Sequence, residues 1–305
     1  MTEIAKLHDD EVDIDACLVA RLISAQFPQW ADLTIRAVAA SGTDHVTFRL
    51  GADLGVRLPR TPWAAGQVEH DTTWLPRLAA QLPLAVPEPV AIGAPGQGYP
   101  FSWGVYRWLD GEAFQLDLVR DPAQAAADLA GFIGSLQALD ATGAPVPADD
   151  PFSRGTPLAP RDALFREALD ELRTEYDTGL VLAAWEASLA AEAWRGAAVW
   201  IHGDLLPGNL LVAEGRLSAV IDFATLRAAD PAGDLLAAWY VFTGESRRVF
   251  RSELGVDDDT WARGRGWALS LELISIPYYR RRNPEAVRAP SRVIADTLTD
   301  FAAEG

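Results

Sequence analysis

The chain has 305 residues, of which 49% are hydrophobic, so it can fill the core of one large domain or of two lobes. Its 26 basic and 43 acidic residues give a formal net charge of −17. This charge disfavours binding to nucleic acid or to an anionic membrane and would attract a cationic partner, although acidity can also serve solubility alone. No apolar run is long enough to cross a membrane, and the acidic N-terminus lacks the pattern of a signal peptide. The sequence therefore predicts a cytoplasmic protein.

The first third of the chain predicts a small lobe that contains both helix and sheet. A helix is expected over residues 13–27, where apolar residues recur every fourth position before Pro28. Short strands are expected over 33–39, 46–50 and 54–58, separated by turn-forming residues as in an antiparallel meander. A helix over 67–82 follows, in which Pro76 predicts a kink or a break. Two further strands are expected over 90–92 and 103–109.

From residue 121 onward the pattern is mostly helical. The expected helices span 122–139, 161–176, 180–194, 234–242, 259–275 and 290–302. A loop followed by a hairpin interrupts them between residues 199 and 223. The predicted fold class is α+β, with a sheet-containing N-terminal lobe (1–106) and a larger helical lobe (107–305). Ligands usually bind in the cleft between two such lobes.

The loop and hairpin contain the candidate catalytic and metal-binding residues. His202-Gly203-Asp204 is followed by Asn209, five positions after the aspartate, and Asp222 ends an apolar strand. Phosphoryl transfer requires one carboxylate to orient and deprotonate a hydroxyl, while an amide oxygen and a second carboxylate hold Mg²⁺. A hairpin between Asn209 and Asp222 would bring these two residues to adjacent positions.

The segments around these residues, 201–209 and 221–223, resemble the catalytic loop and the metal-binding segment of the aminoglycoside phosphotransferase family. That family consists of small-molecule kinases, among them antibiotic-resistance enzymes, with a protein-kinase-like fold. The resemblance extends over about residues 33–301 but is specific only between 201 and 223. It implies that Asp204 is the catalytic base, that Asn209 and Asp222 bind Mg²⁺, and that His202 braces the loop.

Each of these residues also has a simpler interpretation. Asp204 and Asn209 could be turn residues and Asp222 a strand-end cap, but turns require neither the five-residue spacing nor the second aspartate. His202 could ligate a metal together with Asp204, although no other metal-binding pattern accompanies it. Asp234, in the segment after the metal-binding motif, is predicted to cap a helix and brace the catalytic loop.

The N-terminal lobe is expected to contact the nucleotide. Ser41, Gly42 and Thr43 form a turn whose backbone N–H groups could cover phosphate. Kinase-like folds place a lysine on the third strand, but the only lysine here is Lys6, so Arg57 is predicted to hold the phosphates. The resemblance agrees, since macrolide phosphotransferase-like members carry arginine in this segment.

The predicted partner of Arg57 is a helix carboxylate, either Asp71 or, as a fallback, Glu69; both could instead be solvated helix charges. The shorter aspartate side chain would compensate for the longer arginine. The strand that contains Tyr106 and Trp108 is expected to lie against the nucleotide base and to hold it by backbone groups.

The resulting prediction is a kinase that transfers the γ-phosphoryl group of ATP or GTP to a hydroxyl of a small molecule, with Mg²⁺ as cofactor. The first candidate acceptor is a cationic aminoglycoside-type antibiotic. A macrolide is a second candidate, because aromatic residues that could line an apolar pocket are numerous: Trp239, Tyr240, Trp261, Trp267, Tyr278 and Tyr279. The sequence is also compatible with a metabolic small-molecule kinase, with a catalytically idle protein that binds a nucleotide or a ligand, and with a helical scaffold.

Overall fold

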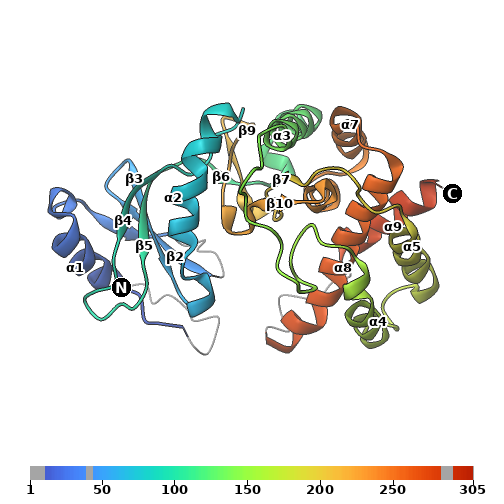
Figure 1. Ribbon diagram of the computed structural model, residues 1–305, viewed down its shortest axis with the longest axis horizontal. Helices are drawn as coiled ribbons and strands as arrows, with labels where there is room; N and C mark the ends of the chain where they lie inside the picture. The colour runs from blue at the N-terminus through green and yellow to red at the C-terminus, as the bar shows by residue number, and fades with distance from the viewer. Residues whose placement is uncertain (1–10, 39–43, 283–290, 305) are drawn as a thin grey trace. The chain divides into compact units, whose positions relative to one another are not determined.

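The computed structural model describes residues 11–38, 44–282 and 291–304, with the side chain of Arg282 left out (Figure 1). The chain divides into two compact units. Unit 1 consists of Met1–Ala80 and Ala85–Asp110, and unit 2 consists of Gln81–Leu84 and Gly111–Gly305. None of the helices in the described ranges is both long enough and apolar enough to cross a membrane.

Unit 1 is built on a five-stranded antiparallel sheet with the order β1-β2-β3-β5-β4. The strands are β1 (Ile35–Ala37), β2 (His45–Leu50), β3 (Leu54–Pro59), β4 (Pro89–Gly93) and β5 (Trp103–Arg107). The predicted meander and the two later strands are confirmed, with ends that differ by at most two residues from the prediction. The predicted end of the first strand, Ala39, lies outside the described residues.

Two helices pack on opposite faces of this sheet (Figure 1). Helix α1 (Ala16–Gln26) covers one face, where alternate strand residues such as Phe48, Val56 and Val105 form the apolar core. Helix α2 (Gln67–Leu78) lies on the other face and approaches β5. The opposite set of alternate residues, including Arg57 and Tyr106, therefore points toward α2.

Helix α2 continues through Pro76 and ends two residues later, followed by the short 3₁₀ helix η3 (Ala79–Gln81). The predicted helix extended to residue 82. Proline has no N–H to donate to the preceding turn, so the α-helical bonding is lost close to Pro76.

Unit 2 is mainly helical, and most of the predicted helices are confirmed with shorter or shifted ends. Its helices are α3 (Pro122–Gln137), α4 (Asp162–Glu171), α5 (Thr178–Ala190), α6 (Ala237–Tyr240), α7 (Gly244–Leu254), α8 (Asp258–Arg282) and α9 (Arg292–Glu304). Helices α4, α5, α8 and α9 lie together around a core that includes Trp185 and Trp267 (Figure 1). The predicted start of the last helix, Pro290, lies outside the described residues.

Near residue 240 one predicted helix was wrong in part and one helix was missed. The helix expected over 234–242 is reduced to the four residues of α6, preceded by the 3₁₀ helix η8 (Pro231–Asp234). Helix α7 was not predicted because its sequence is strongly charged and offers few apolar positions; Phe250 is its buried apolar anchor. Its boundaries are nevertheless encoded, since Thr243 forms a capping box with Ser246 and Gly255 ends the helix with φ of 62°.

Two small sheets position the loop and hairpin. Strand β7 (Val199–Ile201) pairs with β10 (Arg227–Ala229), and β6 (Glu112–Ala113), β8 (Leu210–Ala213) and β9 (Arg216–Val220) form a three-stranded antiparallel sheet. The predicted hairpin is therefore confirmed as β8 and β9. The motif residues lie at the ends of these strands, between β7 and β8 and after β9.

Candidate functional site

The β8–β9 hairpin brings Asn209 and Asp222 next to each other. Leu210 at the start of β8 pairs with Val220 at the end of β9, and the backbone N–H of Ile221 donates to the carbonyl oxygen of Asn209 at 2.9 Å. Asn209 and Asp222 therefore flank the same end of one antiparallel pair, as predicted from the sequence.

Asn209 also holds Asp204. Its Nδ2 donates to the backbone oxygen of Asp204 at 2.8 Å and to the carboxylate Oδ2 at 2.9 Å. The loop between them closes on itself, because Leu206 N–H bonds Asp204 O and Asn209 N–H bonds Leu206 O. The five-residue spacing thus forms a compact turn, which fixes the position of the half-buried Asp204 carboxylate.

His202 is fully buried below this loop. Its Nε2 lies 3.1 Å from the carbonyl oxygen of Ile221, and its Nδ1 accepts the backbone N–H of Asp204 at 3.2 Å. This pattern corresponds to a neutral ring protonated at Nε2, which packs edge-on against Phe223 with centroids 4.6 Å apart. His202 thus connects the loop that carries Asp204 to Ile221, which lies between the end of β9 and Asp222.

Asp234 supports the same loop from beneath. Its two carboxylate oxygens accept the backbone N–H groups of His202 at 3.0 Å and Gly203 at 2.6 Å. The pKa of Asp234 is raised from 3.8 to about 7, mainly by burial and to a smaller extent by the negative charge of Asp204, against the lowering effect of the two backbone hydrogen bonds. The expected bracing role is confirmed, but the expected capping role is wrong: Asp234 is the last residue of η8, which is capped by Asp230, and the N-cap of α6 is Leu236.

Two residues of the site have left-handed backbone conformations. Gly203 has φ of 81°, which lets the chain turn sharply between His202 and Asp204. Asp222 has φ of 64° and ψ of 69°, in a region that few residues other than glycine adopt. Such conformations often occur at functional sites, because the surrounding structure must enforce them.

The donor set at Asn209 and Asp222 fits a magnesium ion. Asn209 turns its Nδ2 toward Asp204, which places Oδ1 on the other side of the amide. Asp222 adds a half-buried carboxylate two residues after the end of β9. Magnesium prefers hard oxygen ligands and commonly takes only one or two carboxylates from a protein, with phosphate and water completing its shell.

Sequence reasoning missed Arg154, which lies beside the predicted base. Its Nη2 is 3.7 Å from Asp204 Oδ1, and only 14% of its side chain is exposed. Its Nη1 donates to Phe152 O at 3.0 Å, and its guanidinium carbon lies 5.7 Å from the centroid of the Trp267 ring. Arg154 stands in the connection after α3, fifty positions before Asp204 and outside any motif, so no local pattern could identify it.

In unit 1, the structure brings the predicted cation and carboxylate together. Arg57 Nη1 on β3 lies 3.9 Å from Asp71 Oδ2 on α2, and Asp71 is 1% exposed. The fallback residue, Glu69, is exposed on the same helix. The geometry therefore favours Asp71 over Glu69 as the partner of Arg57.

Tyr106 and Trp108, which were also predicted to lie at the nucleotide, make side-chain contacts within unit 1. Tyr106 is buried against α2, and Arg49 stacks on the Trp108 ring with its guanidinium carbon 4.2 Å from the ring centroid. The backbone N–H of Trp108 donates to Asp53 O at 2.9 Å, so this donor is used within unit 1. Ser41, Gly42 and Thr43 lie outside the described residues.

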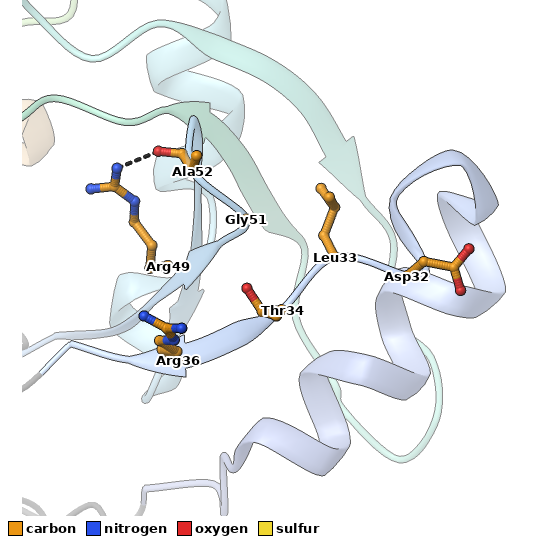
Figure 2. A pocket seen from close by; sticks show the side chains of 7 residues that line it. All are labelled: Asp32, Leu33, Thr34, Arg36, Arg49, Gly51 and Ala52. Carbon is orange, nitrogen blue, oxygen red and sulfur yellow. Dashed lines mark hydrogen bonds between the residues drawn. The ribbon is translucent and has the colours of Figure 1, made fainter.

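A separate hollow of about 640 Å³ opens on unit 1 near the β1–β2 edge (Figure 2). It is lined by Asp32, Leu33, Thr34, Arg36, Arg49, Gly51 and Ala52. Figure 2 shows the Arg49 side chain bonded to the carbonyl oxygen of Ala52, and Arg49 also bonds Asp110 at 3.2 Å. The hollow includes none of the predicted site residues.

Comparison with known families identifies the class of protein. The model of the phosphotransferase enzyme family (APH) matches residues 34–267, which is more than half of the chain. The protein therefore belongs to the phosphotransferase enzyme family, as the motifs predicted. No curated protein sequence gives a significant match.

Solved structures of similar fold include aminoglycoside and macrolide enzymes. The GDP and kanamycin complex of APH(2")-IIia has 21% identity and a TM-score of 0.70, over 94% of this chain and 99% of that one. The streptomycin–ATP complex of APH(2")-IIa has 18% identity and a TM-score of 0.59, over 93% and 99%. Macrolide 2'-phosphotransferase MphH from Brachybacterium faecium has 23% identity and a TM-score of 0.58, over 91% and 99%. These similarities confirm the predicted fold.

Proposed function

We propose that the protein transfers the γ-phosphoryl group of ATP or GTP to a hydroxyl group of a small molecule in a Mg²⁺-dependent reaction. The observation that carries this proposal is the arrangement of Asp204, Asn209 and Asp222. The Asp204 carboxylate accepts a hydrogen bond from the amide of Asn209. Asp222 follows β9, the strand that pairs with β8 next to Asn209. A turn or a strand-end cap alone requires no such arrangement.

Asp204 would orient the acceptor hydroxyl and take its proton while the hydroxyl oxygen forms a bond to the γ-phosphorus and the bond to the nucleoside diphosphate breaks. Asn209 and Asp222 would hold Mg²⁺, which when bound neutralises negative charge on the phosphates. Arg57 would hold the phosphates, since a guanidinium can donate to two oxygens at once. His202 and Asp234 keep the backbone around Asp204 in place.

An aminoglycoside-type antibiotic remains the first candidate acceptor. The net charge of −17 favours the approach of a polycation, and two of the structurally similar enzymes are described with kanamycin or streptomycin. A macrolide acceptor would need aromatic residues that line a pocket. Trp239, Trp261 and Trp267 are instead buried in the core, which removes half of the candidate set.

The acceptor panel is the direct test. The purified protein is incubated with Mg²⁺ and ATP or GTP against aminoglycosides, macrolides and small alcohols, and mass spectrometry detects a phosphate added to each acceptor. We expect phosphorylation of at least one hydroxyl compound, with aminoglycosides as the first candidates. Nucleotide binding without any phosphorylated product would instead favour a catalytically idle, ligand-binding protein. Absence of nucleotide binding would contradict the proposed kinase function.

A further inference from the structure

The buried carboxylate of Asp71 has a second partner besides Arg57. The hydroxyl of Tyr106 donates to Asp71 Oδ2 at 2.9 Å, and both residues are buried, at 5% and 1% exposure. Arg57 Nη1 lies 3.9 Å from the same oxygen, and His70 Nδ1 lies 3.7 Å from Oδ1. The short contact to Asp71 is therefore made by the tyrosine, while the arginine lies at the longer distance.

Glycine at position 104 makes this arrangement possible. Gly104 is paired with Arg57 across β3 and β5, and it lies two residues before Tyr106 on the same face of β5. A Cβ atom at position 104 would lie 2.4 Å from Cε2 of the Tyr106 ring and 2.8 Å from Cγ2 of Val68. The tyrosine ring thus occupies the space of the missing side chain and points its hydroxyl at α2.

The arrangement also bears on Arg57 itself. The Arg57 guanidinium carbon lies 5.9 Å from the centroid of the Tyr106 ring. The ring therefore lies beside the cation, while the hydroxyl of the same residue donates to Asp71. A buried carboxylate requires hydrogen-bond donors, and a neutral hydroxyl supplies one without adding charge. Tyr106 can therefore fix the carboxylate that faces Arg57 and leave the positive charge of the site to the arginine.

We propose that Tyr106 is a positioning residue, which orients Arg57 toward the nucleotide phosphates by holding Asp71. This inference rests on the proposed function, because it assumes that Arg57 holds phosphate. The expectation from the sequence was that the strand containing Tyr106 holds the nucleotide base by backbone groups, and it gave the Tyr106 hydroxyl no role.

The test is Tyr106→Phe, which removes the hydroxyl and keeps the ring. Affinity is measured in the presence of Mg²⁺ for the nucleoside triphosphate that the wild-type protein binds and for the corresponding nucleoside, which lacks phosphates. We expect triphosphate affinity to weaken by about threefold to tenfold, less than the full effect of losing a hydrogen bond to a charged group, because Tyr106 acts on the phosphates only through Asp71 and Arg57. Nucleoside affinity should be unchanged. Equal weakening of both ligands would show that Tyr106 acts on the base, and would overturn the inference.

Tyr99→Phe is the matched control. The Tyr99 hydroxyl is buried in the same unit and donates to Pro59 O at 2.7 Å, on the opposite side of the sheet from α2. Its loss costs one buried hydrogen bond and should leave triphosphate affinity unchanged. Thermal unfolding of both variants checks that they are folded. An equal loss of triphosphate affinity in Tyr99→Phe would show a general loss of stability in the unit and would contradict the proposed role.

A double-mutant cycle with Asp71→Ala tests the route through the carboxylate. If Tyr106 acts through Asp71, adding Tyr106→Phe to Asp71→Ala should change triphosphate affinity by less than about twofold. Additive losses would overturn the inference while leaving the proposed function standing. A wild-type protein that binds no nucleotide would instead reject the proposed function and this inference with it.

Discussion

Asn209 Nδ2 lies within hydrogen-bond distance of both the backbone oxygen and the carboxylate of Asp204, at 2.8 and 2.9 Å. The residue proposed to bind metal through its oxygen thus also fixes the proposed base through its nitrogen. An amide can serve both roles at once because its two ends differ, whereas a carboxylate can only accept.

This dual role predicts the effect of replacing Asn209. Asn209→Asp keeps an oxygen ligand but loses the donor and places a second negative charge against Asp204. We expect kcat at saturating Mg²⁺ to fall by about 10- to 100-fold, at least as far as in Asn209→Ala. Steady-state kinetics over a range of Mg²⁺ concentrations provides the measurement. Near-normal activity of Asn209→Asp would mean that Asn209 acts only as a metal ligand.

Arg154 is expected to support the base electrostatically. It places a cation 3.7 Å from Asp204 Oδ1 in a mostly buried setting, where the attraction between the two groups restricts the orientation of the carboxylate. In steady-state kinetics, Arg154→Gln should lower kcat by about tenfold with little change in nucleotide affinity, and Arg154→Lys should recover part of the loss.

Arg227→Gln is the control for Arg154. Arg227 bonds Thr225 O at 2.8 Å and also bonds the hydroxyl of Ser153, the residue before Arg154. It therefore supports the same segment by contacts other than the one to Asp204. Equal losses of kcat in Arg154→Gln and Arg227→Gln would show that kcat depends on the structure of the segment at residues 153–154 and not on the contact between Arg154 and Asp204.

The Arg57–Asp71 pair predicts compensation between two substitutions. Arg57→Lys shortens the cationic side chain and Asp71→Glu lengthens the acidic one. The combined length of the two side chains therefore stays similar in the double variant. The double variant should retain more kcat/KM than either single variant, with a coupling of about 0.5 to 3 kcal/mol. Additive losses in the double-mutant cycle would show that the two residues do not act as a pair.

Asp234 predicts a specific dependence of stability on pH. Because burial raises its pKa from 3.8 to about 7, the folded state retains a proton that the unfolded state has released. The stabilising contribution is complete below the unfolded pKa and is lost as pH rises through about 7. Urea unfolding of the wild-type protein and of Asp234→Asn should therefore show a steeper loss of stability in the wild type between about pH 4 and pH 7. Parallel pH dependences would contradict the raised pKa.

The sequence was most informative where local chemistry determines the structure. Turn-forming residues between short segments predicted β2 and β3, strand-favouring residues predicted β5, and the loop and hairpin expected between residues 199 and 223 predicted the hairpin that joins Asn209 to Asp222. These features depend on residues close in sequence, where strand propensity and turn preferences act directly.

The remaining features depend on residues far apart in the chain. Arg154 reaches Asp204 only through the packing of unit 2, and the hydroxyl of Tyr106 reaches Asp71 only because Gly104 leaves room for the ring. Asp234 and Asp230 both precede helical segments, and only the structure shows that the first braces the loop while the second caps. Tertiary packing decides such roles, so composition and spacing could not assign them.

In the proposed reaction, Asp204 accepts the proton of the acceptor hydroxyl during phosphoryl transfer. The most direct measurement compares acceptor-dependent phosphate transfer by the wild-type protein and by Asp204→Asn at saturating nucleotide and Mg²⁺, together with nucleotide affinity. We predict that kcat falls by about 10²- to 10⁴-fold while nucleotide affinity changes little. Transfer at an undiminished rate by Asp204→Asn would contradict this assignment.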